Sequence, residues 1–383
     1  MKRHVNFILF FGWVLSFVIS LEGYSQPEKA SESIQEIMRE SNVVGISVAV
    51  VKKNKIIYTQ SFGQKNVEQN MPLTDDCIFR IASISKSFSA TSIMQLVEAK
   101  KIALSDDVSK LVGFSIRNPR YPETVITLKM LLSHQSSIND SQGYFSLDSI
   151  NPSINPNWKK CYNDYEPGKG YEYCNLNFNM AGTIIEKVSG ERFDLYVKRH
   201  ILDPLKLYGG YCVDSLDKSR FATIYEYNAD STRFIASPNA YAPRSKEIAN
   251  YVMGYTTPIF SPTGGMKISA TDLAKYMLMH SNFGKYGGTR IILKNSAREM
   301  QTKLSEEEGY GLALETTEKM IPGKTLKGHT GSAYGLFSAM FFHPKEKFGI
   351  VVISNGCDPV HSGLYNVVIK KAVNALYESL IME

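Results

Sequence analysis

The sequence predicts a protein of mixed α/β structure, of the α+β type. One antiparallel sheet, flanked by helices, is built from both ends of the chain, and a mainly helical lobe is inserted between them. Three observations predict this fold: residues 44–66 contain two β-rich runs, strand patterns return after Gly309, and the clearest helical patterns lie between these regions. Strands at both ends of a chain with a helical middle are most simply joined in one sheet that helices cover.

The N-terminal part of the sheet is predicted as a hairpin. A helical pattern at 33–42 is followed by VGISVAVVKKNKIIYTQSFGQKN, where two β-rich runs surround the turn-prone KKNK. From Ile84 to Lys101 the periodicity changes to that of a helix, and one face of it carries Phe88, Ile93, Leu96 and Val97. The chain therefore passes from sheet to helix at Ser83.

Further helices are predicted in the middle of the chain, and strands again near its end. The helical stretches are ITLKMLLSHQ, MAGTIIEKVSGERFDLYVKRHIL and SATDLAKYMLMHSNFG. The later strand stretches are YGLALET, TLKGHTG, GLFSAMFFHP and FGIVVISN, before a last helix in LYNVVIKKAVNALYESL. We expect one domain over 26–383, with a sheet lobe from 26–82 plus 309–383 and a helical lobe from 83–308.

Composition narrows the function classes. The 383 residues are 43% hydrophobic and 21% charged, with a net charge of +6, and the basic residues are scattered rather than grouped in one stripe. Nucleic acid is therefore not an expected partner. The histidines show no metal-ligand spacing, so no metal site is expected. No motif implies an organic cofactor either. The five cysteines are odd in number and widely spaced, which predicts buried or free thiols.

The first 25 residues are typical of a secretory signal peptide. Lys2 and Arg3 precede the apolar run FILFFGWVLSFVISL, and Gly23 and Ser25 supply small residues for cleavage. The run is short for a membrane span, so we expect export, most simply to the periplasm. An uncleaved anchor, and with it a membrane contact, is the alternative.

A serine and a lysine three positions apart stand where the helix begins. Ser83 and Lys86 would share one face of that helix, near its positive N-terminal end. A hydroxyl needs a base to become a nucleophile, and a desolvated lysine can lose its proton and serve as one. The spacing alone is weak evidence, because Ser215 and Lys218 repeat it in a polar stretch.

Two later clusters strengthen the prediction of a catalytic site. Tyr173 and Asn175 lie two apart in a loop that leads into an apolar helix, and His329, Thr330, Gly331 and Ser332 lie on a predicted strand. A tyrosine can relay a proton, and an asparagine amide can bind both a lysine and a substrate carbonyl. A strand edge of small residues lets a peptide-like substrate approach the backbone.

These three ordered motifs, Ser-x-x-Lys, Tyr-x-Asn and His-Thr-Gly, resemble those of the penicillin-recognising serine hydrolases. This family includes D-Ala-D-Ala peptidases, β-lactamases and related esterases and aminopeptidases. The likeness extends from VGISVAVVKKNK to FGIVVISN and includes FRIASISKSFSA, LLSHQSS, PGKGYEYCN, SPTGGMKISATDLAKYM and GHTGSAYGLFS. It implies the fold of serine β-lactamases and penicillin-binding proteins, with the site between the two lobes.

The resemblance also implies a role for each motif residue. Ser83 would attack a carbonyl and form an acyl-enzyme, with Lys86 as first base and Tyr173 passing a proton to the leaving group. Asn175 would bind the substrate amide and orient Lys86. The strand with His329, Thr330, Gly331 and Ser332 would bind substrate, and the backbone N–H groups of Ser83 and Ser332 would form the oxyanion hole. The motifs leave open whether Lys86 or Tyr173 is the true base.

Two positions depart from the family pattern. His329 stands where many β-lactamases have lysine, and an imidazole only partly charged near neutral pH would hold a substrate carboxylate less firmly. Ser137 stands where the family usually has glycine, so a turn that needs a positive φ there would be strained.

The preferred activity is hydrolysis of D-amino-acid peptides, as in a D-Ala-D-Ala carboxypeptidase. An esterase, a class C-like β-lactamase and a catalytically silent protein that binds cell-wall peptides are the alternatives. The expected substrate is accordingly a small peptide, a lactam or an ester.

Overall fold

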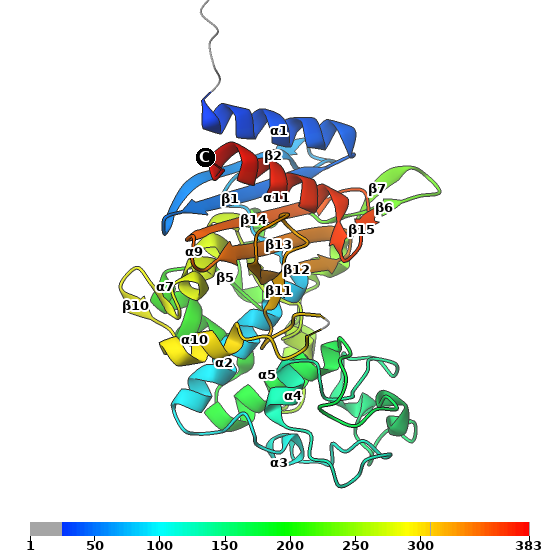
Figure 1. The fold of residues 1–383 in the computed structure, drawn as a ribbon. Helices are drawn as coiled ribbons and strands as arrows, with labels where there is room; N and C mark the ends of the chain where they lie inside the picture. Colours follow the sequence, from blue (N-terminus) through cyan, green and yellow to red (C-terminus); the bar gives the residue numbers. More distant parts are fainter. Residues whose placement is uncertain (1–24, 307, 383) are drawn as a thin grey trace, which may run out of the picture.

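The sheet predicted from both chain ends is present in the computed structural model, which describes residues 25–306 and 308–382. Its seven strands lie in the order β11-β12-β13-β14-β1-β2-β3, and every neighbouring pair is antiparallel. The central strand β1 (Gly45–Lys52) pairs with β2 (Lys55–Asn66) on one side and with β14 (Phe348–Gly356) on the other, so distant parts of the chain lie side by side (Figure 1). The remaining strands are β3 (Met71–Pro72), β11 (Glu315–Thr317), β12 (Leu326–Ala333) and β13 (Leu336–His343). The predicted signal peptide lies, except for Ser25, outside the described residues.

The predicted hairpin between β1 and β2 turns at Lys53 and Asn54. Lys52 pairs directly with Lys55, and the two residues between them have φ angles of 52° and 64°. Positive φ at both central positions is the geometry of the two-residue turns whose twist matches that of the flanking strands. Asparagine tolerates this backbone well, which explains the turn-forming character of KKNK.

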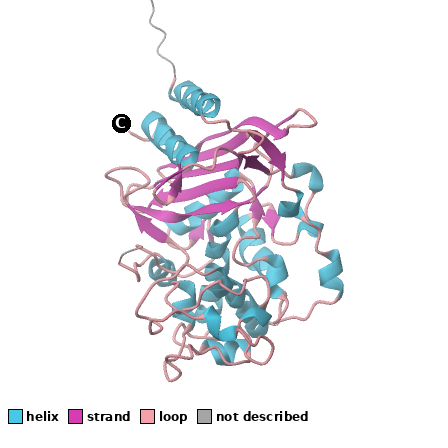
Figure 2. Cartoon of the chain, turned by 90° about the vertical axis from the view of Figure 1, so that its right-hand side faces the viewer, coloured by secondary structure: helices cyan, strands magenta, loops and turns pink. Residues whose placement is uncertain are grey.

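Alternate side chains of β1 enter two different cores. Val48 and Val50 pack with the helices α1 (Gln26–Glu40) and α11 (Val367–Leu380), whereas Ala49 and Val51 belong to the core on the opposite face. This division follows from the two-residue period of a strand. Figures 1 and 2 show α1 and α11 together on one face of the sheet, with the other helices on the far side.

The helix α9 (Ala270–Ser281) covers the second face of the sheet, although its residues fall within the range predicted for the helical lobe, 83–308. It packs against β1, β13 and β14. Gly349 of β14 makes this contact possible, because a Cβ there would lie 2.5 Å from Cε of Met277. The inserted region therefore supplies part of the sheet lobe as well as the helical lobe.

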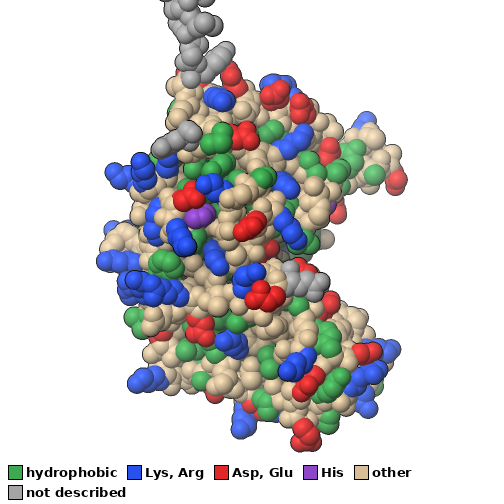
Figure 3. Space-filling view, in the orientation of Figure 1, with side chains coloured by type: hydrophobic (Ala, Val, Ile, Leu, Met, Phe, Trp, Pro, Cys, Tyr) green, Lys and Arg blue, Asp and Glu red, His purple; other side chains and the backbone are tan. Residues whose placement is uncertain are grey.

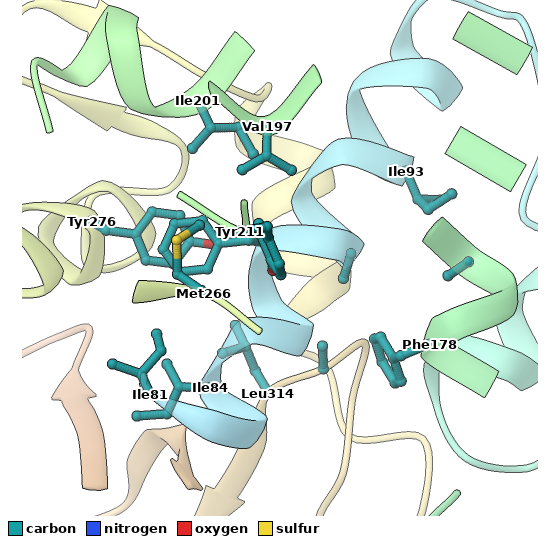
Figure 4. Packing of buried hydrophobic residues seen from close by; sticks show 14 of the residues in the cluster. Ile81, Ile84, Ile93, Phe178, Val197, Ile201, Tyr211, Met266, Tyr276 and Leu314 are labelled. Carbon is teal, nitrogen blue, oxygen red and sulfur yellow. The ribbon is translucent and has the colours of Figure 1, made fainter. Parts of the chain in front are cut away.

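The helical lobe is organised around α2 (Ser85–Glu98), which packs against α5 (Asn175–Ser189) and α6 (Phe193–Val197). Figure 4 shows Tyr211 and Met266 on one side of α2 and Phe178 on the other. A helix enclosed in this way holds its residues rigidly.

The other helices and short strands are α3 (Val108–Val112), α4 (Leu128–Leu132), α7 (Asp203–Leu205), α8 (Ser245–Ala249), α10 (Lys294–Met300), β4 (Phe79–Arg80), β5 (Gly209–Gly210), β6 (Tyr225–Asn228), β7 (Arg233–Ala236), β8 (Lys267–Ile268), β9 (Lys285–Tyr286), β10 (Thr289–Arg290), β15 (His361–Ser362) and β16 (Tyr365–Asn366).

The state of the cysteines and the distribution of surface charge can be compared with the predictions from composition. All five cysteines are buried and unpaired, as predicted. Acidic and basic side chains are mixed over the face in Figure 3, with more lysines and arginines along its left-hand edge. Within residues 25–306 and 308–382, no helix has the length and apolar character needed to cross a membrane.

Candidate active site

The structure brings all eight predicted site residues to one place between the lobes. A cavity of about 880 Å³ is lined by Ser83, Tyr173, Asn175, His329, Thr330, Gly331 and Ser332. Lys86 lies fully buried next to Ser83. Ser83 belongs to the short 3-10 turn Ala82–Ile84 that precedes α2, and Lys86 lies in the first turn of α2. Asn175 begins α5, with Tyr173 two residues before it, and β12 carries His329, Thr330, Gly331 and Ser332. Three separate elements therefore meet at the serine.

Lys86 is held by three oxygen atoms. Its Nζ lies 3.0 Å from Ser83 Oγ, 2.9 Å from Asn175 Oδ1 and 3.0 Å from the backbone oxygen of Thr263. Burial lowers the pKa of Lys86 to about 7, against the partial opposing effect of Asp140 and Cys174. A large fraction of the lysine is therefore neutral at physiological pH.

The neutral lysine is oriented as a base toward the serine. A neutral amine has two hydrogens and one lone pair, and the oxygens of Asn175 and Thr263 that face it can only accept hydrogen bonds. These two oxygens take the two hydrogens, so the lone pair is left for the Ser83 hydroxyl. This is the arrangement that a serine nucleophile requires.

Tyr173 stands beside this pair as a protonated phenol. Its ring centroid lies 4.7 Å from Lys86 Nζ. Burial raises the pKa of Tyr173, and the opposing effect of its hydrogen bond with Ser83 is smaller. The lysine therefore loses its proton at a much lower pH than the tyrosine, so Lys86 is the candidate base and Tyr173 the candidate proton donor. His134 contacts the loop that carries Tyr173: its Nδ1 accepts the backbone N–H of Cys174 at 3.1 Å.

His329 is neutral, and both of its ring nitrogens have partners within the protein. Nδ1 donates to the backbone oxygen of Thr330 at 2.5 Å, which leaves Nε2 to accept the hydroxyl of Tyr310 at 2.9 Å. Burial and the nearby Lys86 lower the pKa of His329 to about 3. The expectation of a partly charged imidazole is therefore wrong, because burial removes the charge near neutral pH altogether.

Gly331 lets β12 approach the nucleophile. A Cβ at this position would lie 2.2 Å from the backbone oxygen of Ile81 and 2.5 Å from Ser338 Oγ, so no side chain fits. The backbone of Ala82 turns through a φ of 48° in the same contact. This close packing places Ser332 and Ser83 on the wall of one cavity, where their backbone N–H groups are the candidate oxyanion hole.

Replacing Gly331 with alanine should separate β12 from Ser83. We expect kcat/KM to fall about 100-fold, because a displacement of about 1 Å in a catalytic geometry has such an effect. We also expect a loss of about 1–3 kcal/mol in the free energy of unfolding from overpacking. Steady-state kinetics and chemical denaturation measure the two effects. Gly210→Ala is the matched control, because a Cβ there meets its nearest atom at 3.7 Å; equal effects of both substitutions would refute the role of the close contact.

The departure at Ser137 has the predicted consequence. Its φ is 61°, a left-handed conformation that glycine would adopt without strain. The hydroxyl of Ser137 accepts a hydrogen bond from Asn118 Nδ2 at 2.9 Å, and the neighbouring Ser136 donates to Asn177 Oδ1 at 3.0 Å. These bonds hold the strained loop in place, and the residues of the site keep their contacts.

The second Ser-x-x-Lys pair does not form a comparable site. Ser215 donates its hydroxyl to the backbone oxygen of Cys212, and Lys218 is an exposed side chain. Neither residue lines the cavity with Ser83. The same Ser-x-x-Lys spacing therefore gives a candidate catalytic pair at Ser83, where the lysine is buried, and a surface pair at Ser215, where the lysine is exposed.

Three residues that contact the predicted site residues were not identified from the sequence. Thr263 lies in a stretch that contributed to the family resemblance, but its backbone and hydroxyl contacts depend on the fold. Asp140 and Tyr310 carry no local signal, since each acts on a residue far away in the chain: Asp140 on Asn175, and Tyr310 on His329.

Comparison with known proteins identifies similar sequences and structures. The family model described as Beta-lactamase matches residues 30–372. Protein flp of Staphylococcus aureus (strain MRSA252) is 24% identical over 331 residues, which are 84% of this chain, and the matched part is 61% of that longer protein. The octameric penicillin-binding protein homologue from Pyrococcus abyssi superposes with a TM-score of 0.72 and 28% identity, over 91% of this chain and 76% of the other. D-amino acid amidase from Ochrobactrum anthropi SV3 has the same fold, with a TM-score of 0.69 and 22% identity over 91% and 98% of the two chains.

Proposed function

The chain belongs to the Beta-lactamase family and is a serine hydrolase, and from that premise we propose that it hydrolyses amide bonds of D-amino-acid peptides or amides through an acyl-enzyme on Ser83. The observation that carries this proposal is the contact between Ser83 Oγ and the buried Nζ of Lys86, 3.0 Å long, at the wall of a substrate-sized cavity. A silent binding protein would not need a lysine whose burial lowers its pKa to about 7.

Acylation uses the hydrogen bonds already present. Lys86 takes the proton of Ser83, and Oγ attacks the carbonyl carbon while the backbone N–H groups of Ser83 and Ser332 bind the oxyanion. The intermediate then collapses and the C–N bond breaks, as the leaving amine takes a proton delivered through Tyr173. In the second half a water molecule gives a proton to the base and attacks the ester carbonyl, and Ser83 recovers its proton as the acid leaves.

The charges around the cavity favour substrates with an amino group over substrates that end in a free carboxylate. Glu172 and Glu308 line it, together with Glu315, whose pKa burial raises to about 7. Arg80 is the one cationic side chain among the described residues of the lining, and its guanidinium already donates to Gly264, Ala240 and Ser261. With His329 neutral, a substrate carboxylate could pair only with Arg80 among the described lining residues, and that guanidinium is buried and already hydrogen-bonded. An ammonium group has carboxylates nearby.

We therefore prefer amides and N-terminal residues of D-amino-acid peptides to the D-Ala-D-Ala carboxypeptidase reaction. The name of the similar D-amino acid amidase supports this choice of substrate class. We further propose that the protein acts after export, on small peptides of cell-wall type. The basic and apolar residues of the first 25 positions support export, and a periplasmic location is its simplest consequence.

The proposed function is tested with purified 26–383 and a panel of substrates. D-alanine amide, L-alanine amide, N-acetyl-D-Ala-D-Ala and a neutral p-nitrophenyl ester are compared by kcat/KM, and intact-mass spectrometry follows a mixture with benzylpenicillin. We expect D-alanine amide to be hydrolysed faster than both its L-isomer and the carboxylate-bearing peptide. Turnover of the ester alone would favour an esterase, and consumption of penicillin through a transient adduct would indicate a β-lactamase.

His329→Lys should change the preference for carboxylates. A lysine places a positive charge beside Thr330 and Ser332 where the wild type has none, so the ratio of kcat/KM for N-acetyl-D-Ala-D-Ala to that for the neutral ester should rise about tenfold. His200→Lys is the control, because His200 is 42% exposed and pairs with Glu191 away from the cavity. An unchanged ratio would remove His329 from the account of specificity.

A further inference from the structure

Asp140 lies behind Asn175 and makes contacts that determine how Asn175 is oriented. Its Oδ2 accepts the backbone N–H of Asn175 at 2.8 Å and the side-chain Nδ2 of the same residue at 2.9 Å. Its Oδ1 accepts the backbone N–H of Leu176 at 3.0 Å and the thiol of Cys174 at 3.2 Å. The carboxylate thus bonds the first turn of α5 and one side-chain amide together.

These contacts leave one orientation for the Asn175 amide. A carboxylate only accepts hydrogen bonds, so the amide turns its NH₂ group toward Asp140. The amide oxygen then faces away from Asp140, where it accepts from Lys86 Nζ at 2.9 Å and from Thr263 Oγ1 at 2.8 Å. Asp140 takes one of the two N–H bonds of this NH₂ group, which the family resemblance implies for substrate binding.

We propose that Asp140 is a positioning residue of the reaction: its carboxylate holds the Asn175 amide with the oxygen toward Lys86, so that the lone pair of the lysine stays directed at Ser83. The opposite orientation would aim an N–H of Asn175 at Lys86 Nζ and compete with the Ser83 hydroxyl for that lone pair. This inference rests on the proposed acyl-enzyme function. It adds to that function a residue that does not line the catalytic cavity.

Asp140 has a second effect, through its charge. It raises the pKa of Lys86 against the larger lowering by burial. Other titratable groups also surround Lys86. Cys174, like Asp140, raises the pKa of the lysine. His134 and His329 also interact electrostatically with Lys86, and burial holds both of them neutral. Ser83, Thr263 and Tyr173 complete the surroundings as uncharged partners. Asp140 is therefore the carboxylate that balances the buried ammonium.

The two effects separate in a pH profile of kcat/KM. Asp140→Asn removes the charge and offers the amide a weaker, neutral partner. We expect the plateau to fall about 10- to 100-fold, and the midpoint of the ascending limb to move to lower pH by about one pH unit, since a nearby opposite charge shifts a pKa by about this much. Asp140→Glu keeps the negative charge, but its longer side chain changes the hydrogen-bond geometry to Asn175. We therefore expect the plateau of kcat/KM to fall, while the midpoint of the ascending limb stays at the wild-type pH.

Controls identify which proposal fails. In an Asn175→Ala background, Asp140→Asn should lower the plateau less than about threefold, because the amide it orients is gone. Asp164→Asn, at an exposed site paired with Arg120, should change neither the plateau nor the limb. If Asp140→Asn does not fold, Asp140→Glu alone decides by its plateau. An active wild type together with an unchanged plateau and limb in the folded Asp140 variants overturns the positioning role, whereas a wild type inactive on the whole substrate panel overturns the proposed function instead.

Discussion

Ser83→Ala is expected to lower kcat/KM for amide substrates by about 10⁴-fold or more, since loss of the nucleophile removes the covalent path and leaves only the oxyanion hole and binding. The variant should also lose covalent labelling by a serine-directed phosphonate, measured as the mass added to the intact protein. The fold should be unaffected, because Ser83 is partly exposed at the cavity wall and the cavity accommodates the loss of one hydroxyl.

Ser215→Ala is the matched control for this experiment. It removes the serine of the other Ser-x-x-Lys pair, whose hydroxyl bonds only to the backbone of its own turn. We expect it to label and to turn over substrate like the wild type. Labelling that persists in Ser83→Ala, or disappears in Ser215→Ala, would show that Ser83 is not the nucleophile.

Lys86→Met is expected to lower kcat/KM by about 10³-fold, within the usual contribution of a positioned general base. Methionine has a similar length and is apolar, so it fills the buried space without a basic nitrogen. In the wild type, kcat/KM should rise with pH through a midpoint near 7, where the lysine becomes neutral. That limb should be missing from the residual activity of the variant, and Lys218→Met should retain it, because Lys218 is exposed elsewhere. A limb near pH 7 that survives in Lys86→Met would assign the titration to another group.

The same substitution should change how stability depends on pH. The pKa of Lys86 falls from 10.5 in an unfolded chain to about 7 in the folded protein, so the unfolded state binds more protons between these values and the free energy of unfolding rises with pH. The cost of burying the ammonium is fully present below about pH 7 and disappears toward pH 10.5. It amounts to about 5 kcal/mol at most. Denaturation between pH 7 and 10 should therefore show a steeper rise for the wild type than for Lys86→Met.

The fold was predictable where local patterns carry the information. The hairpin at Lys53 and Asn54, the helix after Ser83 and the last helix follow directly from turn chemistry and periodicity. The predicted strand YGLALET, residues 310–316, starts only at Glu315 and extends to Thr317, because Ala313 turns with a φ of 61°. The packing of α9 on the sheet was not predictable, since a helix can cover either lobe and the space left by Gly349 is a property of the assembled sheet.

The site was predictable as a set of residues but not as a network. The three motifs name the residues that reach the cavity, because the chemistry restricts their types and order. The neutral state of His329 depends on Tyr310 and on burial, and the orientation of Asn175 depends on Asp140; none of these follows from spacing. Sequence patterns report which side chains are present, whereas protonation states are set by neighbours that only the fold brings close.

The pairing of β1 with β14 has a consequence for how the protein is made. Gly45 opposes Gly356 and Lys52 opposes Phe348, so the centre of the sheet closes only after the whole segment between Lys52 and Phe348 has been synthesised. Contacts of such sequence separation slow folding, because the loop entropy must be lost before they form. A chain that stops before Phe348 would leave the edges of β1 and β13 without their partner, and open edges of apolar strands favour aggregation. Until Phe348–Gly356 emerges during synthesis, β1 therefore has β2 as its only partner in the order of the described sheet.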